Sequence, residues 1–386
     1  MKILIFATHP IQYQAPIYRK LSELYDIKVY FLMNQTAKGQ GKAGFGVDFE
    51  WDVPLTEGYN FEFLTNISNK ATTGSYTGIV IDAKELKKVL EVDRPSLVIV
   101  NGWFPKGLRQ VASFFKRKGV TAVCRGDSNL SMSSNHLKNL LKEVYIRWIV
   151  RKFDYFLYVG EASRQFYLHY GIDKFRLFPA VHSINTPFFE EEYQNITPVK
   201  NKDGKIILGF VGKLINKKEP LLLLDAIYKS KWKDSIILKV VGDGPLKQSL
   251  LDKALELNIE LDFVGFLNQS EIVEKGYANL NALILPSSIN ETWGLVVNEV
   301  MTGGIPVLVS NRVGCHEDLV IDGVTGYVFE SGNFENFVEK LNQLIEKLKS
   351  GHDFSDNVFK QINKYSIDQT IKGYSALIKH IEKNKK

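Results

Sequence analysis

Cysteine is scarce in this chain, and long apolar runs are missing. Only Cys124 and Cys315 occur, without paired spacing, which argues against a disulfide framework or a zinc cluster. No segment offers the roughly 18 apolar residues of a membrane span. The opening MKILIFATHP has too short an apolar run for a signal peptide, so we interpret it as a buried first strand. A reducing cytoplasm is therefore the expected location.

A strong excess of one charge is also missing. Lys and Arg total 49 against 43 Asp and Glu, a formal charge of +6. This excess is too small to indicate nucleic-acid binding, although it suits phosphorylated ligands or an anionic membrane surface. The hydrophobic fraction of 45% and the charged fraction of 24% are ordinary for a folded domain. Disorder and fibrous structure are therefore excluded.

Short β-rich runs alternate with helical periodicity along most of the chain. Such alternation predicts parallel sheets covered by helices on both faces. Residues 34–80 are less regular, and their glycines indicate a mobile excursion. The expected strands are 2–8, 27–33, 96–101, 120–124, 155–159, 206–211, 236–241, 261–264, 282–285 and 305–309, and the expected helices include 15–24, 83–92, 106–118 and 135–152.

The length of 386 residues predicts two packed cores. Charge, Pro and Gly break the pattern near 190–204, after which the alternation restarts. We expect an α/β protein of two doubly wound, Rossmann-like domains facing a central cleft, with ligands at the carboxyl ends of the strands. The predicted organisation is an acceptor-side domain over 1–190, a linker over 191–204, a donor-binding domain over 205–365, and a C-terminal helix over 366–386 that returns to the first domain.

The most informative stretch is ALILPSSINETWGLVVNEVMTGGIPVLVS, which begins at residue 282. A buried strand is followed by a polar loop and by a helix that starts near Gly294. Unpaired N–H groups at a helix start bind anions, and a diphosphate is a natural occupant. Glu291 in the loop and Glu299 in the second helical turn could accept hydroxyl hydrogen bonds from one ligand. Taken alone, the two carboxylates could equally be a helix cap and an exposed side chain.

The surrounding motifs carry a resemblance. E-T-W-G-L-x-x-x-E, followed by G-G-I-P-V, S-x-x-x-G and G-x-x-G, resembles the family-4 retaining glycosyltransferases of the GT-B fold, the "glycosyl transferases group 1" type. Their hallmark is two Glu separated by seven residues, here Glu291 and Glu299. Trp293 stands where Phe is commoner. The resemblance covers nearly all of 206–330 and is looser over the N-terminal half.

Two upstream segments also resemble this family. FVGKLINKKEPLLLLDAI, over 210–227, is similar to its phosphate clamp, with Lys213 in place of the usual Arg and Lys218 as the second cation. Two ammonium groups can stabilise a leaving diphosphate as its charge grows. VVGDGPL, over 240–246, is similar to the turn that lines the nucleotide base and ribose.

The resemblance implies a sugar donor activated by a nucleoside diphosphate, UDP or GDP, and retention of anomeric configuration. It implies that Glu291 orients the donor sugar and Glu299 holds the ribose. No D-x-D motif stands in a suitable loop, so neither a metal nor another cofactor is expected. The predicted donor-binding residues are Gly212, Lys213, Lys218, Gly242, Gly244, Thr292, Trp293, Gly294, Leu295 and Glu299.

The acceptor half offers two loops at its expected cleft. THPIQYQAP, over 8–16, supplies His9, which either serves the reaction or packs against the next helix. The second loop carries Arg125 and Asp127, where relatives commonly place a His that contacts the donor sugar. Asp127 could equally cap a helix. Glu291, Asp127, Arg125 and His9 are the candidate catalytic residues.

The predicted helix over 135–152 carries an apolar stripe flanked by Lys and Arg. We favour packing of this stripe on the sheet. The open alternative is peripheral attachment to the anionic inner face of a membrane that carries a lipid-linked acceptor.

The sequence favours transfer of a sugar to a glycan or lipid-linked acceptor in the synthesis of a surface polysaccharide or glycoconjugate. Two alternatives remain open: a sugar-nucleotide epimerase of the same architecture, and a non-catalytic subunit that binds a nucleotide sugar.

Overall fold

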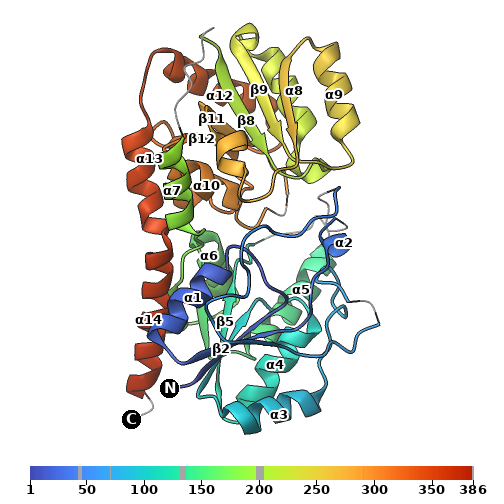
Figure 1. The fold of residues 1–386 in the computed structure, drawn as a ribbon, viewed down its shortest axis with the longest axis vertical. Coiled ribbons are helices and arrows are strands. Elements are labelled where there is room, and N and C mark those ends of the chain that lie inside the picture. The colour runs from blue at the N-terminus through green and yellow to red at the C-terminus, as the bar shows by residue number, and fades with distance from the viewer. Residues whose placement is uncertain (42–45, 70, 131–135, 197–203, 290, 385–386) are drawn as a thin grey trace. The chain divides into compact units, whose positions relative to one another are not determined.

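The computed structural model describes residues 1–41, 46–69, 71–130, 136–196, 204–289 and 291–384. The chain forms two compact units, each built on its own sheet (Figure 1). Unit 1 comprises Met1–Gln35, Pro54–His182 and Ile367–Lys386, and unit 2 comprises Thr36–Val53 and Ser183–Ser366. Among the described residues, no helix combines the length and the apolar character needed to cross a membrane.

Unit 1 is built on a 7-stranded sheet of order β3-β2-β1-β4-β5-β6-β7. Every pairing in it is parallel. The order reverses direction after β1, so the ends of β1 and β4 form a switch point where a crevice opens in folds of this kind. The strands are β1 (Ile3–Ala7), β2 (Ile27–Phe31), β3 (Phe61–Phe63), β4 (Leu97–Asn101), β5 (Thr121–Gly126), β6 (Tyr155–Tyr158) and β7 (Leu177–Pro179).

Helices cover both faces of this sheet. The odd-numbered side chains of β1 pack with α1 and α14 in one apolar cluster, whereas its even-numbered side chains pack with the other helices in a second cluster. The near-continuous apolar strands follow from this two-sided burial. The helices are α1 (Ala15–Leu24), α3 (Ala83–Asp93), α4 (Lys106–Arg117), α5 (His136–Val150), α6 (Glu161–His169), α14 (Ile367–Asn384) and the 3-10 turn η2 (Lys174–Arg176).

Helix α14 lies unusually close to the backbone at the end of β7 and just after it. Thr370 donates its hydroxyl to the Val181 carbonyl at 2.7 Å. A Cβ atom on Gly373 would overlap the Pro179 carbonyl and lie 3.0 Å from the Ala180 Cα. Gly373 is therefore needed for close helix–sheet packing, and the last helix is an integral layer of unit 1.

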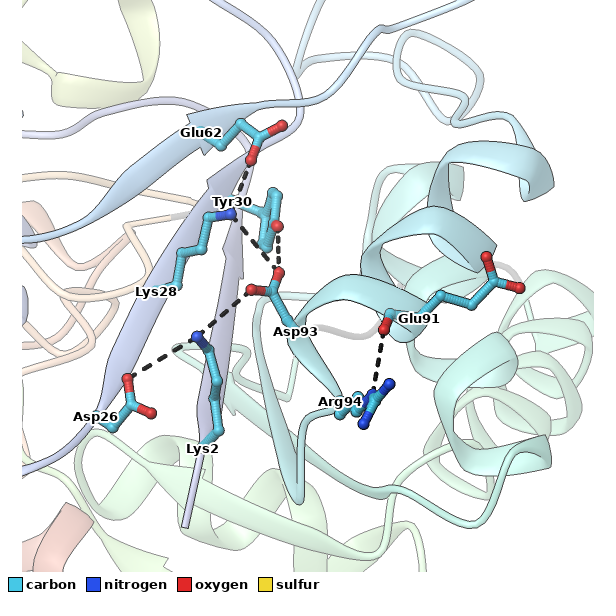
Figure 2. A network of polar contacts seen from close by, with 8 residues as sticks. All are labelled: Lys2, Asp26, Lys28, Tyr30, Glu62, Glu91, Asp93 and Arg94. Atoms are coloured by element: carbon cyan, nitrogen blue, oxygen red, sulfur yellow. Dashed lines mark hydrogen bonds and ion pairs between the residues drawn. The ribbon is translucent and has the colours of Figure 1, made fainter.

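A charged network ties together the amino-terminal side of this sheet (Figure 2). The Asp93 carboxylate at the end of α3 is only 5% exposed and lies 3.4 Å from the Lys2 ammonium and 3.6 Å from that of Lys28. The Tyr30 hydroxyl donates to the same carboxylate, and burial together with this bond raises the pKa of Tyr30. Each buried charge is thus paired, as burial requires. Lys2 precedes β1 and Asp93 precedes β4, so the network lies away from the carboxyl ends and is structural.

Unit 2 repeats the architecture on a 6-stranded sheet of order β10-β9-β8-β11-β12-β13, again parallel. Helix α8 packs against α9 and α12, while α10 packs against α7 and α13. The strands are β8 (Ile206–Val211), β9 (Ile236–Val241), β10 (Glu260–Gly265), β11 (Ala282–Leu285), β12 (Val307–Ser310) and β13 (Gly326–Phe329). The helices are α2 (Ala37–Gln40), α7 (Thr186–Asn195), α8 (Pro220–Lys229), α9 (Lys247–Glu256), α10 (Leu295–Thr302), α11 (His316–Leu319), α12 (Phe334–Lys349) and α13 (Ser355–Ile362), with 3-10 turns η3 (Asn216–Lys218), η4 (Lys233–Ser235) and η6 (Asn363–Tyr365) and a π-turn η5 (Ile272–Tyr277).

The two Rossmann-like sheets confirm the predicted fold class. The division of the chain differs from the expected one in two respects. Thr36–Val53, part of the irregular excursion, belongs to unit 2, and unit 2 resumes at Ser183, before the predicted linker. Helix α7 fills the start of that linker because Thr186 and Pro187 begin a regular helix. Residues 197–203 of the linker lie outside the described residues.

Candidate functional site

The loops that follow β8, β9 and β10 are joined by backbone hydrogen bonds at the carboxyl ends of these strands. The Gly212 N–H donates to the Val241 carbonyl at 2.9 Å, and the Gly242 N–H donates to the Gly265 carbonyl at 2.8 Å. Gly242 has φ +136° and leaves no room for a Cβ atom against the Gly212 carbonyl. Gly244 has φ +152°, and its Cβ position lies 2.9 Å from the Leu214 N. Gly242 and Gly244 are therefore required by close backbone approach.

Lys218 is the second predicted cation, and it lies at the end of η3. The next residue, Glu219, adopts a left-handed conformation with φ 54° and leads directly into Pro220 at the start of α8. This tight turn directs the Lys218 ammonium to the Glu291 carboxylate, with which it forms an ion pair. The two side chains are only 12% and 14% exposed. The structure thus unites two residues that lie on loops far apart in the sequence.

Lys213 lies in the same electrostatic neighbourhood. Burial, together with the smaller effects of the nearby Lys217 and Lys218 ammonium groups, lowers the pKa of Lys213 to about 8, whereas Glu291 opposes the shift. The ammonium groups of Lys213, Lys217 and Lys218 outnumber the Glu291 carboxylate, so this part of the site has an excess of positive charge. Such a cluster at the carboxyl end of a parallel sheet is suited to a multiply charged anion.

The loop that carries Glu291 is held from both sides. The Gly314 N–H donates to the Glu291 carbonyl at 2.9 Å. The buried Ser287 hydroxyl donates to the Glu291 carboxylate at 3.3 Å. Gly294, with φ 96°, then forms the N-cap of α10, which begins at Leu295. The left-handed Gly294 turns the chain so that the first turn of α10 follows the Glu291 loop directly.

Trp293 does not present its side chain to this loop. It is 3% exposed, and its indole N–H donates to the Asn298 amide oxygen at 2.7 Å. Its ring lies 5.9 Å from the ring of Tyr365. The side chain of Trp293 is thus part of the interior. Of this residue, the backbone is the part that a donor could contact. Its neighbour Thr292 is exposed.

Glu299 lies in different surroundings from Glu291. The Tyr277 hydroxyl at the end of η5 donates to the Glu299 carboxylate. Burial raises the pKa of Glu299 to about 7, against the effect of that hydrogen bond. The carboxylate is also close enough to Tyr193 of α7 to raise the pKa of its phenol. The two glutamates therefore contact different partners, and the expectation that both face one ligand stays a prediction.

In unit 1, His9 follows β1 at the switch point. Its Nδ1 atom lies 3.0 Å from the Thr8 hydroxyl oxygen. Burial lowers the pKa of His9 to about 4. The imidazole is therefore neutral near pH 7, so it can donate or accept a hydrogen bond but cannot supply a proton as an imidazolium.

Arg125 is part of β5, which runs on to Gly126, whereas we predicted a strand that ends at residue 124. Its guanidinium is buried, and its Nε and Nη2 atoms have no hydrogen-bond partner among the described residues. Asp127 follows, and its charge raises the pKa of Tyr13, after the larger effect of burial. The ring of Tyr13 lies 5.2 Å from that of His182. This cluster gathers at the carboxyl ends of the unit 1 strands.

Two residues of these sites escaped the sequence analysis. Tyr277 contacts Glu299 across 22 positions of sequence, and no local motif marks it. His182 is buried, and Arg125 contributes to holding its pKa well below the ordinary value, after burial. Its position after β7 could be found from the sequence only if that three-residue strand were predicted.

Within the described residues, no group of three or more His, Cys, Asp or Glu is arranged to hold a metal ion. The expectation of a reaction without a metal or other cofactor stays a prediction.

Comparison with known proteins places this geometry in a family. Residues 192–361 match the family described as "Glycosyl transferases group 1". They belong to it. This confirms the predicted resemblance for the unit that holds Lys213, Lys218 and Glu291.

Individual relatives match this chain over part of their length. The sulfoquinovosyl transferase of Arabidopsis thaliana is 29% identical over 185 residues, which cover 46% of this chain and 34% of the relative. The lipopolysaccharide 1,6-galactosyltransferase of Escherichia coli is 27% identical over 200 residues, which cover 50% and 52%. The matched part is thus about a third to a half of these curated relatives.

A solved structure resembles the whole chain. The Anabaena protein HepE, in complex with UDP and glucose, superposes with a TM-score of 0.69 at 16% identity, covering 98% of this chain and 100% of that one. Such low identity supports the fold alone. The fold is the GT-B architecture expected from the sequence.

Proposed function

We propose that this chain is a retaining, metal-independent glycosyltransferase that moves a sugar from a nucleoside diphosphate sugar to a hydroxyl group of a glycan or lipid-linked acceptor. The observation that carries the proposal is the meeting of Lys213, Lys218 and Glu291 at the carboxyl ends of β8 and β11, beside the start of α10. Cations there suit a diphosphate, and a carboxylate beside them suits sugar hydroxyl groups.

A UDP-sugar is the donor that the relatives favour. The Anabaena protein of the same fold holds UDP and glucose. Galactosyl and sulfoquinovosyl transferases are among the matched relatives. A diphosphate on Lys213 and Lys218 would put the attached sugar against Glu291.

Catalysis on this reading depends on charges set in place before the donor binds. As the glycosidic bond breaks, negative charge grows on the leaving diphosphate, where Lys213 and Lys218 stabilise it. Lys218 already lies against Glu291, so both side chains are ordered in advance and lose little freedom on binding. Glu291 then accepts hydrogen bonds from sugar hydroxyl groups. The leaving diphosphate deprotonates the acceptor hydroxyl on the same face, which gives retention.

Glu299 has a narrower role than its position in the motif implies. Tyr277 occupies one side of its carboxyl group, which leaves the other oxygen to accept from a ribose hydroxyl. With a pKa near 7, the group is partly protonated at neutral pH. We propose that Tyr277 orients Glu299 toward the ribose.

The donor proposal is tested by a screen of UDP-, GDP-, ADP- and CMP-sugars for thermal stabilisation and slow hydrolysis. We expect a UDP-sugar to raise the melting temperature by linkage. Because Lys213 has a pKa of about 8 without ligand and binds the diphosphate when charged, affinity should fall about tenfold between pH 7 and pH 9. In Lys213→Arg the affinity should hardly change over this range, since arginine stays charged.

Three results would contradict the proposal. If no nucleotide sugar stabilises the protein, donor binding is disproved. If a nucleotide sugar turns over without any acceptor into its epimer, the chain is the epimerase considered as an alternative. Binding without hydrolysis or transfer to any acceptor would indicate the non-catalytic subunit.

The exposed surface of helix α5 indicates where a lipid-linked acceptor could be presented. Its Ile146 and Ile149 are buried, as expected for packing on the sheet. Four other apolar side chains of α5 are exposed: Leu140 is 61% exposed, Leu141 63%, Val144 63% and Trp148 51%. Cationic side chains flank this exposed stripe, and the Lys152 ammonium lies 3.7 Å from the centre of the Trp148 ring.

We propose that this face of α5 binds the surface of an anionic membrane, where a lipid-linked acceptor is presented. An apolar stripe with a cationic border matches the acyl and headgroup regions of such a surface. At low salt the protein should float with vesicles of phosphatidylcholine and phosphatidylglycerol, and Leu141→Glu/Val144→Glu should weaken binding at least about tenfold.

The matched control is Leu255→Glu, because Leu255 is 84% exposed on α9 and lies outside this face. It should float like the unaltered protein. Equal flotation of the α5 variant, or no flotation of the unaltered protein, would disprove membrane contact.

A further inference from the structure

The connection between β2 and β3 sends a segment of chain into unit 2. We name residues 46–53 of this connection the strap. At its start, Gly46 has φ +78°, and a Cβ atom there would lie 3.1 Å from the Gly244 N and 3.1 Å from the Asp243 Oδ1. The strap therefore touches the turn after β9 that resembles the base- and ribose-lining turn of the family.

An aromatic contact continues the attachment at the end of β10. The Phe49 ring lies 4.5 Å from the ring of Phe266, which follows β10 directly, and 5.0 Å from that of Trp51. Phe49 is only 9% exposed. An aromatic side chain so fully covered within a loop indicates a built contact, not a loosely lying segment.

Polar contacts fix the far end of the strap. The Asn268 amide donates to the Glu50 carbonyl at 2.7 Å. The Ser270 N–H lies 3.2 Å from an Asp52 carboxylate oxygen, and the Ser270 hydroxyl donates to the same oxygen. Apolar and polar contacts together hold the strap along the carboxyl ends of β9 and β10.

The sheet order relates this position to the donor. The strands lie in the order β10-β9-β8-β11, and the proposed diphosphate site lies over β8 and β11. Neighbouring strands are about 4.8 Å apart, so the ends of β9 and β10 lie roughly 5 to 10 Å further along. A nucleoside extends about this far beyond its diphosphate. The strap therefore lies where the nucleoside end of the donor would be.

We propose that the strap forms the outer wall of the nucleoside end of the donor site, where the covered Phe49 ring supports the half-buried Phe266 ring as the apolar surface against the planar base. This inference rests on the proposed function, because it presupposes a nucleoside diphosphate on Lys213 and Lys218. Contact between a base and aromatic side chains discriminates a nucleotide from its bare phosphate groups. Phe49 is then a specificity residue contributed from outside the matched family region.

The test compares two probes, UDP and inorganic pyrophosphate, by isothermal titration. Phe49→Ala should weaken UDP binding by about 10- to 100-fold and leave pyrophosphate binding within about twofold. Phe175→Ala is the matched control, since Phe175 is 71% exposed and lies in unit 1. Phe49→Leu, which keeps an apolar side chain, should retain the fold and lose part of the UDP affinity.

The outcomes separate the two proposals. If Phe49→Ala binds UDP as tightly as the unaltered protein, the proposed role of the strap is wrong. The same holds if the variant loses affinity for UDP and pyrophosphate equally. Tighter UDP binding in Phe49→Ala would also overturn this role, because the strap would then be occupying the base site itself. If the unaltered protein binds pyrophosphate but not UDP, the strap inference fails while the anion site stands. If it binds neither, the proposed function fails.

Discussion

Replacing Lys218 with methionine should lower kcat for sugar transfer by about 10²- to 10³-fold, the cost of removing a pre-positioned charge from a developing anion. The loss should be largest in kcat, because the diphosphate carries more charge in the transition state than in the bound donor. Lys218 is held in advance by Glu291, so its charge is in place before the donor binds. Steady-state kinetics with a UDP-sugar and its acceptor measure the effect.

Two control variants test whether the loss of kcat is specific to Lys218. Lys229→Met removes the same charge from an exposed position at the end of α8 and should leave kcat within about twofold. Because Lys218→Met leaves the Glu291 carboxylate without its cation, the double variant Lys218→Met/Glu291→Gln separates loss of the cation from gain of an unpaired carboxylate. Should Lys218→Met retain nearly full kcat, the diphosphate clamp is wrong.

Gly373→Ala should destabilise unit 1 by about 2–4 kcal/mol, although alanine favours an isolated helix by about 1 kcal/mol over glycine. The added methyl group would overlap the Pro179 carbonyl, a backbone atom that cannot rotate away. Helix α14 must then move off the sheet and lose part of its apolar contact with α1. Chemical denaturation followed by tryptophan fluorescence and limited proteolysis near residue 367 both report this change.

Lys372→Ala is the matched control, because Lys372 is the exposed neighbour of Gly373. That variant should keep the free energy of unfolding within about 0.5 kcal/mol. If Gly373→Ala proves as stable as the control or more so, helix propensity outweighs packing and the described contact between α14 and Pro179 is incorrect.

The parallel strands of both units were predictable, because strands buried on two faces form continuous apolar runs. Three strands were not predicted. β3 has only three residues and exposed side chains, β7 is equally short and ends in Pro179, and β13 begins at a glycine. Short strands of this kind have no periodicity of their own and are specified by pairing with a neighbour.

The site was predictable only where chemistry depends on local motifs. The ion pair of Lys218 with Glu291 joins two motifs that the sequence identified. The interior position of the Trp293 side chain and the bond between Tyr277 and Glu299 depend on how helices pack in unit 2. Sequence spacing specifies which residues share a loop or a turn, but packing decides where each side chain points.

The division of the chain has a consequence for how it folds during synthesis. The polypeptide leaves and re-enters unit 1 twice, at residues 35–54 and 182–367. One face of the unit 1 sheet stays without α14 until the ribosome has made the last helix, so the first unit to begin folding is the last to be completed. During that interval the apolar side chains of β1 that meet Leu377 and Ile378 are exposed to solvent, and they form the natural binding surface for a chaperone.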